Sequence, residues 1–303
     1  MGADRVDLSG VLIPTATPFR ATDGEVDLPG FRGNLRGWLA TGVRGVVLGG
    51  STGEAVLLDE EERTRLLEAA REMVPEDRLM VAGTGGESTR ITLRRTREAA
   101  EMGADAVLVQ PPAFYRGQMT PGVLRDHYRT LADASPVPVI LYQVPLRFST
   151  LEFPTGLVAE LSEHPNIIGI KDSRGDLSKL GDLLDQVRSG FQVLVGTGAK
   201  LYASLEMGAV GGILGVANVA PGASAEIVST FLAGRAEEAG AIQERVAPLH
   251  DGIVGAYGVP GVKAAMDLLG MTGGAPRSPL PPLGEAGIET VRGLLEAAAL
   301  PVS

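Results

Sequence analysis

The stretch Ile167-Ile168-Gly169-Ile170-Lys171-Asp172-Ser173 is a short β-branched run that ends in polar residues. Such a run predicts a strand that is buried on both faces. Seven further runs of this kind recur along the chain, and a stretch with the apolar spacing of a helix follows each one. The eight predicted strands are Gly10–Thr17, Gly42–Gly49, Leu79–Gly83, Ala104–Gln110, Val137–Val144, Ile167–Asp172, Phe191–Gly196 and Gly211–Val216. Strands that alternate with helices indicate a continuous parallel sheet.

The intervening helices are expected to begin near Leu28, Asp59, Ser88, Thr120, Pro154, Asp176, Ala199 and Pro221. Two of these starts have a clear physical reason. The run Asp59-Glu60-Glu61-Glu62 would place acids at the positive end of a helix dipole, and Pro221 suits a first helical turn. Eight repeats favour closure into an α/β (β/α)8 TIM barrel, although a doubly wound sheet alternates in the same way. We predict this barrel over residues 1–234.

Residues 235–303 are expected to form helices that pack on the barrel. The segment Arg235–Leu269 has helical spacing, Gly273–Gly284 is rich in glycine and proline, and a last helix is expected to end near Ala299. This tail is too short for an independent mixed domain, since domains usually run to roughly 100–200 residues.

The composition excludes several classes of function. The net charge of −10 and the lack of a Lys/Arg cluster argue against a nucleic-acid partner. The absence of cysteine excludes disulfides, thiolate nucleophiles and thiolate metal sites. No run of about 18 apolar residues occurs, and Met1–Ser9 lacks the apolar stretch of a secretory signal. We therefore expect a cytoplasmic protein without a membrane partner.

The chemistry is expected at the C-terminal ends of the strands, where parallel barrels hold their active sites. Lys171 leaves an apolar strand there, and burial would favour the uncharged amine that can attack a carbonyl. The alternatives are a lysine that reaches solvent and one that pairs with Asp172. The strand pattern alone leaves these possibilities open.

Two other strand ends carry hydroxyl groups. The phenol of Tyr142 could transfer protons beside the amine, but a tyrosine that merely caps the core explains the pattern better on its own. Ser51 and Thr52, in the turn Gly50–Glu54, could bind a carboxylate through their hydroxyls and the backbone amides. Glycine-rich turns also occur simply to permit a tight loop.

Metal chemistry finds no support in the sequence. The three histidines, His127, His164 and His250, all lie away from the strand ends, so core or surface roles are expected for them. A phosphate site at Gly196-Thr197-Gly198, with Lys200 beside it, is a weaker possibility. No metal and no cofactor are predicted.

The chain resembles the dihydrodipicolinate synthase/N-acetylneuraminate lyase family. The resemblance covers nearly the whole chain and is carried, in the family's order and spacing, by Thr17-Pro18-Phe19, Gly50–Glu54, Leu141–Pro145 and Gly169–Ser173. It implies a barrel with C-terminal helices, usually a homotetramer. It also implies that Lys171 forms a Schiff base with pyruvate or another 2-oxo acid, which is joined to or split from an aldehyde.

The resemblance also implies roles for single residues. Tyr142 matches a proton-transferring tyrosine, and Tyr115 matches a tyrosine that reaches the site of a neighbouring subunit. Ser51 stands where a hydroxyl links the two phenols, and Thr52 where the carboxylate of the 2-oxo acid binds. The further substrate-binding residues expected on this basis are Gly53, Arg147, Ser173 and Gly196.

Within the family, the resemblance is closest to the 4-hydroxy-2-oxoglutarate aldolases, which cleave a 2-oxo diacid to pyruvate and glyoxylate. It rests on Tyr115–Met119, His164–Ile167, Lys171–Ser173, Met207–Gly212 and Gly258–Lys263. Arg147, however, is placed like the arginine with which the synthases bind aspartate semialdehyde, and a guanidinium suits either distal carboxylate.

Three departures from the family pattern weigh more against the synthase than against the aldolase. Gln143 replaces the usual asparagine, Phe148-Ser149 replaces Thr-Gly, and Gly196–Gly198 lacks the paired acids that are common in synthases. A sensor that binds a 2-oxo acid without turnover is the alternative from another class, and a cofactor-free phosphosugar isomerase is a more distant one.

Overall fold

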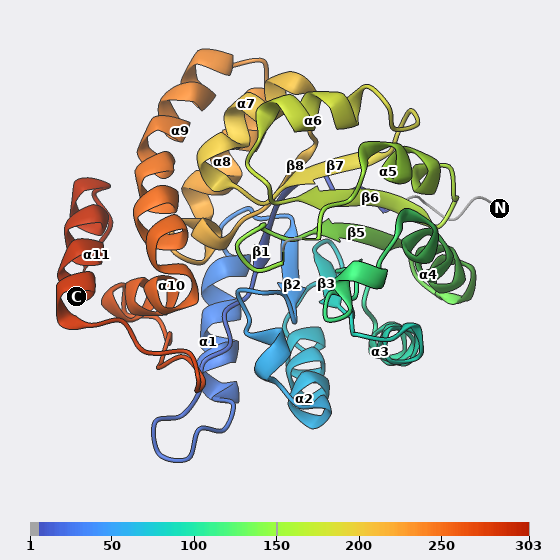
Figure 1. Ribbon diagram of the computed structural model, residues 1–303. Coiled ribbons are helices and arrows are strands. Elements are labelled where there is room, and N and C mark those ends of the chain that lie inside the picture. The colour runs from blue at the N-terminus through green and yellow to red at the C-terminus, as the bar shows by residue number, and fades with distance from the viewer. Residues whose placement is uncertain (1–5, 150, 303) are drawn as a thin grey trace.

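The computed structural model describes residues 6–149 and 151–302, and in this part of the chain eight parallel strands close into a barrel (Figure 1). The strands follow one another in chain order, and the first pairs with the last. They are β1 (Gly10–Pro14), β2 (Gly45–Leu48), β3 (Leu79–Gly83), β4 (Ala106–Val109), β5 (Val139–Gln143), β6 (Ile167–Asp172), β7 (Gln192–Val195) and β8 (Gly211–Ile213). The predicted barrel is confirmed. The predicted strands extend up to three residues too far, because those residues leave the ladder for the loops.

Helices α1 to α8 follow the strands in turn and surround the barrel (Figure 1). They are α1 (Leu28–Leu39), α2 (Glu60–Arg71), α3 (Thr89–Glu101), α4 (Pro121–Ala134), α5 (Thr155–Ser162), α6 (Leu177–Leu184), α7 (Leu201–Met207) and α8 (Pro221–Leu232). The side chains of Asp59, Ser88, Thr120 and Asp176 accept backbone N–H bonds at four of the N-termini. These caps explain why the start signals lie within two residues of the observed starts.

Beyond α8 the described chain continues in α9 (Ala236–Leu249), α10 (Ala256–Leu268) and α11 (Glu285–Ala297). Helix α9 packs on α8, and α11 packs on α10 and α9 at the outside of the molecule (Figure 1). The segment Arg235–Leu269 is helical, as its spacing predicts, but it is not one regular α-helix. A π-helical turn, His250–Gly255, interrupts it, and Gly258 has a non-helical backbone with φ 62°. Such π turns are often found at functional sites.

The direction of Lys171 depends on a shift of register between β5 and β6. Ile140 pairs with Gly169, one residue later than the preceding pair requires, so Ile168 is left out of the ladder. Ile140 and Ile168 both pack in the apolar cluster inside the barrel. Strict alternation from Ile168 would turn Lys171 outward, but the extra residue brings it inward, opposite Tyr142.

The register shift requires a glycine at position 169. A Cβ atom there would lie 2.3 Å from the carbonyl oxygen of Gln192 on β7. That oxygen belongs to the backbone of the neighbouring strand and cannot move aside without breaking the sheet. Gly169 therefore lets β6 and β7 approach closely at the level of the shift.

None of the described helices is long and apolar enough to cross a bilayer. Of the segment Met1–Ser9, in which no secretory signal is expected, residues 1–5 lie outside the described residues.

The close approach at Gly169 predicts a large loss of stability in Gly169→Ala. Overpacking of this kind costs about 1–3 kcal/mol, and a backbone clash places this variant at the upper end. The free energy of unfolding in urea measures the effect. Gly293→Ala is the matched control, because Gly293 lies in α11 with open space around its Cα. It should leave stability unchanged or raise it by about 0.5 kcal/mol. Equal stability of the two variants would contradict the prediction.

Candidate active site

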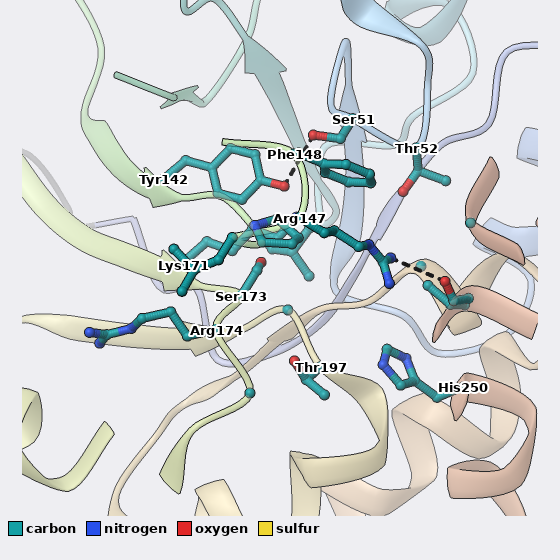
Figure 2. A pocket seen from close by; sticks show the side chains of 18 of the residues that line it. Ser51, Thr52, Tyr142, Arg147, Phe148, Lys171, Ser173, Arg174, Thr197 and His250 are labelled. Atoms are coloured by element: carbon teal, nitrogen blue, oxygen red, sulfur yellow. Dashed lines mark hydrogen bonds between the residues drawn. The ribbon is translucent and has the colours of Figure 1, made fainter. Parts of the chain in front are cut away.

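A cavity of about 420 Å³ opens at the C-terminal end of the barrel (Figure 2). It lies where the sequence analysis expected the chemistry, at the ends of the strands. Seven of the nine predicted site residues line it: Ser51, Thr52, Tyr142, Arg147, Lys171, Ser173 and Gly196. The structure does not bring Gly53 and Tyr115 into its wall.

Lys171 extends from β6 into this cavity and is only 5% exposed. Its Nζ lies 4.3 Å from the ring centroid of Tyr142. No described residue forms a hydrogen bond or an ion pair with the amine. The neighbouring Asp172 pairs instead with Arg174, whose Nη2 lies 2.6 Å from Oδ2. Lys171 is therefore neither a solvent-exposed lysine nor a partner of Asp172.

Arg174 neutralises the carboxylate that follows Lys171 in the chain. It also contacts Glu152, with an Nη1–Oε1 distance of 3.1 Å. Its guanidinium points away from the other labelled side chains in Figure 2. The backbone of this segment thus borders the cavity while the cationic end of Arg174 is held outside it.

The hydroxyl groups of Tyr142 and Ser51 lie 3.2 Å apart and share a hydrogen bond (Figure 2). Tyr142 is buried, and Ser51 stands at the rim of the strand end. The pair forms a path along which a proton can pass from the neighbourhood of Lys171 to the barrel mouth. Tyr115 lies outside this path: it is 70% exposed and packs edge-on against Phe114. Its role in the site of a neighbouring subunit stays a prediction.

The turn at Ser51 and Thr52 offers hydrogen-bond donors to the cavity. The backbone N–H groups of both residues have no acceptor among the described residues, and neither does the hydroxyl of Thr52. Adjacent free donors in a tight turn form a concave site for an anion. This turn can therefore bind a carboxylate beside Lys171.

Gly53 shapes the turn and does not touch the cavity. Its N–H donates to the carbonyl of Gly50 at 3.1 Å, and its own carbonyl accepts the hydroxyl of Thr17 at 2.8 Å. A Cβ atom at position 53 would lie 2.7 Å from the carbonyl oxygen of Thr15. The expected direct contact of Gly53 with substrate finds no support in this geometry.

Glu54 anchors the turn to the C-terminal segment through fully buried charges. Its Oε1 lies 2.8 Å from Nζ of Lys263 on α10, and its Oε2 accepts the backbone N–H of Arg277 at 2.7 Å. Lys263 also donates to the carbonyls of Thr17 and Ala275. Desolvation lowers the pKa of Lys263, while Glu54 acts in the opposite direction. The carboxylate-binding turn therefore depends on residues beyond the barrel.

Arg147 projects from the loop after β5 toward the cavity mouth. It donates to the carbonyls of Val254 and Gly255 at 3.1 and 3.0 Å (Figure 2). Its guanidinium stacks on Phe148, 5.0 Å from the ring centroid. No carboxylate of the described chain pairs with it. Its charge remains available to an anionic ligand.

Gln143, which departs from the family pattern, braces the loop that carries Arg147. Its Oε1 accepts the N–H of Phe153 at 2.8 Å, and its Nε2 donates to the carbonyls of Val144 and Leu151. The side-chain amide of Gln143 thus joins the segment that enters the loop to the segment that leaves it. Its effect on the cavity is indirect, through the position of Arg147.

The sequence analysis missed His250, which lines the cavity from the π-helical turn. The expected core role is confirmed in that the ring is buried, but helical spacing alone could not reveal that the ring also reaches the cavity wall. The closely spaced glycines Gly252, Gly255 and Gly258 were the available signal. His127 and His164 lie elsewhere, bonded to Thr89 and Asp133.

The charges around the cavity favour anions. Lys171 and Arg147 face it, whereas no aspartate or glutamate among the described residues lines it. The described chain also has no group of three or more acidic or histidine side chains that could hold a metal ion.

Residues 7–298 match the Dihydrodipicolinate synthetase family. A 4-hydroxy-tetrahydrodipicolinate synthase from Exiguobacterium sp. is 34% identical, with 91% of this chain and 92% of the relative aligned. A probable mitochondrial 4-hydroxy-2-oxoglutarate aldolase from Emericella nidulans is 36% identical, with 91% and 90% aligned. Among solved structures, a dihydrodipicolinate synthase from Acinetobacter baumannii complexed with pyruvate superposes with a TM-score of 0.92 at 30% identity, over 97% of this chain and all of that one.

The anchor at Glu54 predicts that Glu54→Gln is strongly destabilising, because it leaves the buried charge of Lys263 without a counter-ion. Breaking a buried pair in this way costs about 3–5 kcal/mol, measured as the free energy of unfolding in urea. Glu72→Gln is the control, since Glu72 pairs with Arg32 on the surface and is 63% exposed. It should change stability by less than about 1 kcal/mol. A Glu54→Gln variant as stable as this control would show that the buried pair is not an anchor.

Proposed function

The chain belongs to the dihydrodipicolinate synthetase family, and from this premise we propose that it is a Schiff-base aldolase acting on a 4-hydroxy-2-oxo diacid. The substrate is of the 4-hydroxy-2-oxoglutarate type, and the products are pyruvate and glyoxylate. The observation that carries the proposal is the charge of the cavity, which presents Lys171 and Arg147 but no carboxylate among its described lining residues. A diacid without a cationic group complements such a cavity at both ends.

The substrate spans the cavity from the turn at Ser51 and Thr52 to Arg147. Its first carboxylate binds the free donors of the turn, which brings C2 to the amine of Lys171. Its distal carboxylate binds the guanidinium of Arg147. Ser173 is close enough to β7 that a Cβ atom at Gly196 would lie 1.9 Å from its Oγ. The bare backbone of Gly196 therefore leaves room for the Ser173 hydroxyl to face the substrate.

Cleavage uses the amine as a covalent catalyst. Uncharged Lys171 attacks C2, and loss of water from the carbinolamine leaves an iminium. Removal of the proton from the C4 hydroxyl breaks the C3–C4 bond, the bonding electrons pass into the iminium to form an enamine, and the aldehyde departs. Protonation at C3 restores the iminium, and water then releases pyruvate and the free amine.

Tyr142 supplies and removes the protons of these steps. Its hydroxyl shares a hydrogen bond with Ser51 at 3.2 Å, so a proton can move onward to the rim. The exposed Tyr115 completes this relay from a neighbouring subunit of a homotetramer. Its 70% exposure in the single chain is what such a donated side chain requires.

A second candidate function is condensation of pyruvate with aspartate semialdehyde, as in the synthases. The similar identities of 34% to the synthase from Exiguobacterium and 36% to the aldolase from Emericella support both readings. Aspartate semialdehyde carries an ammonium group, however, and the described lining residues include no carboxylate to receive it. An unpaired buried cation is costly, which favours the diacid.

The Schiff base predicts that borohydride, added with pyruvate, attaches a stable pyruvyl group to Lys171. Peptide mass spectrometry would locate the added mass. Lys200→Arg is the control that should retain the label, since Lys200 is exposed beyond β7, whereas Lys171→Arg should lose it. An unmodified Lys171 peptide at saturating pyruvate would falsify the mechanism.

The charge of the cavity predicts a preference between substrates. Pyruvate release from 4-hydroxy-2-oxoglutarate, followed with lactate dehydrogenase, should exceed condensation of pyruvate with aspartate semialdehyde by about tenfold or more in kcat/KM, the effect of one unsatisfied buried group. Faster condensation would favour the synthase. Pyruvate binding without turnover of either substrate would indicate a sensor.

A further inference from the structure

We propose that His250 is a specificity-determining residue, whose Nε2–H donates a hydrogen bond to the distal carboxylate of the substrate beside Arg147. The inference rests on the proposed function, since it assumes a diacid in the cavity. On this proposal, a residue of the π-helical turn in the C-terminal segment selects an aldehyde that bears a carboxylate. The observations that carry it are the position, the tautomer and the neighbours of the His250 ring.

The ring stands in the wall of the cavity, although its residue lies far from the strands in sequence. Figure 2 shows it on the same side as Thr197 and next to the guanidinium of Arg147. Arg147 is also near enough to disfavour a charge on the ring electrostatically. His250 and Arg147 therefore face the same end of the cavity, away from Tyr142.

The tautomer of His250 is determined by the peptide of Gly198. Nδ1 accepts the backbone N–H of Gly198 at 3.2 Å, so the proton of the neutral ring resides on Nε2. Nε2 has no partner among the described residues and is not sealed within the protein. The ring thus presents a donor to the cavity and lacks an acceptor there.

The Gly198 peptide is itself held from both sides, which prevents the ring from turning over. Gln243 on α9 donates from Nε2 to the carbonyl of Gly198 at 3.0 Å, and its Oε1 accepts the N–H of Tyr202 at 2.9 Å. A flipped His250 ring would lose its bond to the fixed N–H of Gly198. The direction in which Nε2–H of His250 points therefore depends on the packing of α9 against the loop after β7.

Burial keeps the ring uncharged. Desolvation lowers the pKa of His250 to about 4, Asp251 opposes this shift, and Arg147 adds to it. The ring is neutral at physiological pH, so it adds a directional donor without adding a second positive charge to the mouth of the cavity.

A second donor beside Arg147 adds to its binding of a carboxylate, because some N–H groups of Arg147 already donate to the π-helical turn. One N–H of each terminal nitrogen is committed to the carbonyls of Val254 and Gly255. Three of its five N–H groups then remain for the carboxylate of a ligand. The same turn supplies His250, so a carboxylate can be shared between the guanidinium and the imidazole.

The test compares two substrates and two variants. The substrates are 4-hydroxy-2-oxoglutarate and 4-hydroxy-2-oxopentanoate, in which a methyl group replaces the distal carboxylate. In His250→Asn, the side-chain oxygen can take the place of Nδ1 and still accept from Gly198, but no donor reaches the position of Nε2. His250→Gln restores a donor near that position and gives up the contact with Gly198.

We expect His250→Asn to lower the ratio of kcat/KM for the diacid to kcat/KM for the methyl analogue by about tenfold to a hundredfold, the effect of one hydrogen bond to a charged group. His250→Gln should recover much of this ratio. Thermal melting of both variants separates the effect from unfolding, because a change in stability alone would affect the two substrates equally.

An unchanged ratio in His250→Asn would overturn the inference while leaving the Schiff base intact. If His250→Gln lost the ratio at the same time, only the contact with Gly198 would matter. Failure of the wild-type enzyme to trap pyruvate with borohydride is a separate outcome, since it would overturn the proposed function and this inference with it.

Discussion

The extra residue in β6 is the constraint on which the site depends. Because Ile168 is left out of the ladder, the alternation of side chains restarts at Gly169 and Lys171 faces the barrel interior. The same shift turns Asp172 outward, where Arg174 holds it at 2.6 Å. One irregularity thus brings the amine to Tyr142 and separates it from the carboxylate of Asp172. Separation of this kind favours a nucleophilic lysine.

The C-terminal segment completes a site that the barrel alone leaves unfinished. Lys263 anchors the carboxylate-binding turn from α10 through Glu54. The π-helical turn contacts Arg147 through two carbonyls and contributes His250 to the wall. In the proposed function the reactive centre comes from strand ends, whereas the groups assigned to the two ends of the substrate depend for their position on helices outside the barrel. Loss of packing between the two parts would therefore disturb binding before it disturbed the amine.

Sequence reasoning predicted most of the barrel, because each strand and each helix start has a local signal. The capping residues Asp59 and Asp176 are examples, since they mark helices through bonds within one turn. It also selected Lys171, whose apolar approach is visible in the chain. It failed where structure depends on distant partners. The register shift at Gly169 lies in the pairing of β6 with β5, and the place of His250 follows from the packing of α9 on the loop after β7.

The residues of the site lie partly on strands and partly on loops or kinked helices. This difference in position explains why relatives of different activity are about equally similar to this chain. A synthase and an aldolase match it at 34% and 36% identity over nine-tenths of its length. Residues that serve the shared Schiff-base chemistry, such as Lys171 and Tyr142, lie on strands whose pairing limits change. The end of the cavity assigned to the distal carboxylate is formed by Arg147 on a loop and His250 on a kinked helix. A few substitutions there can alter the charge of the cavity without altering the barrel. In the proposed function the charge at the mouth selects the aldehyde, and overall similarity carries little information about it.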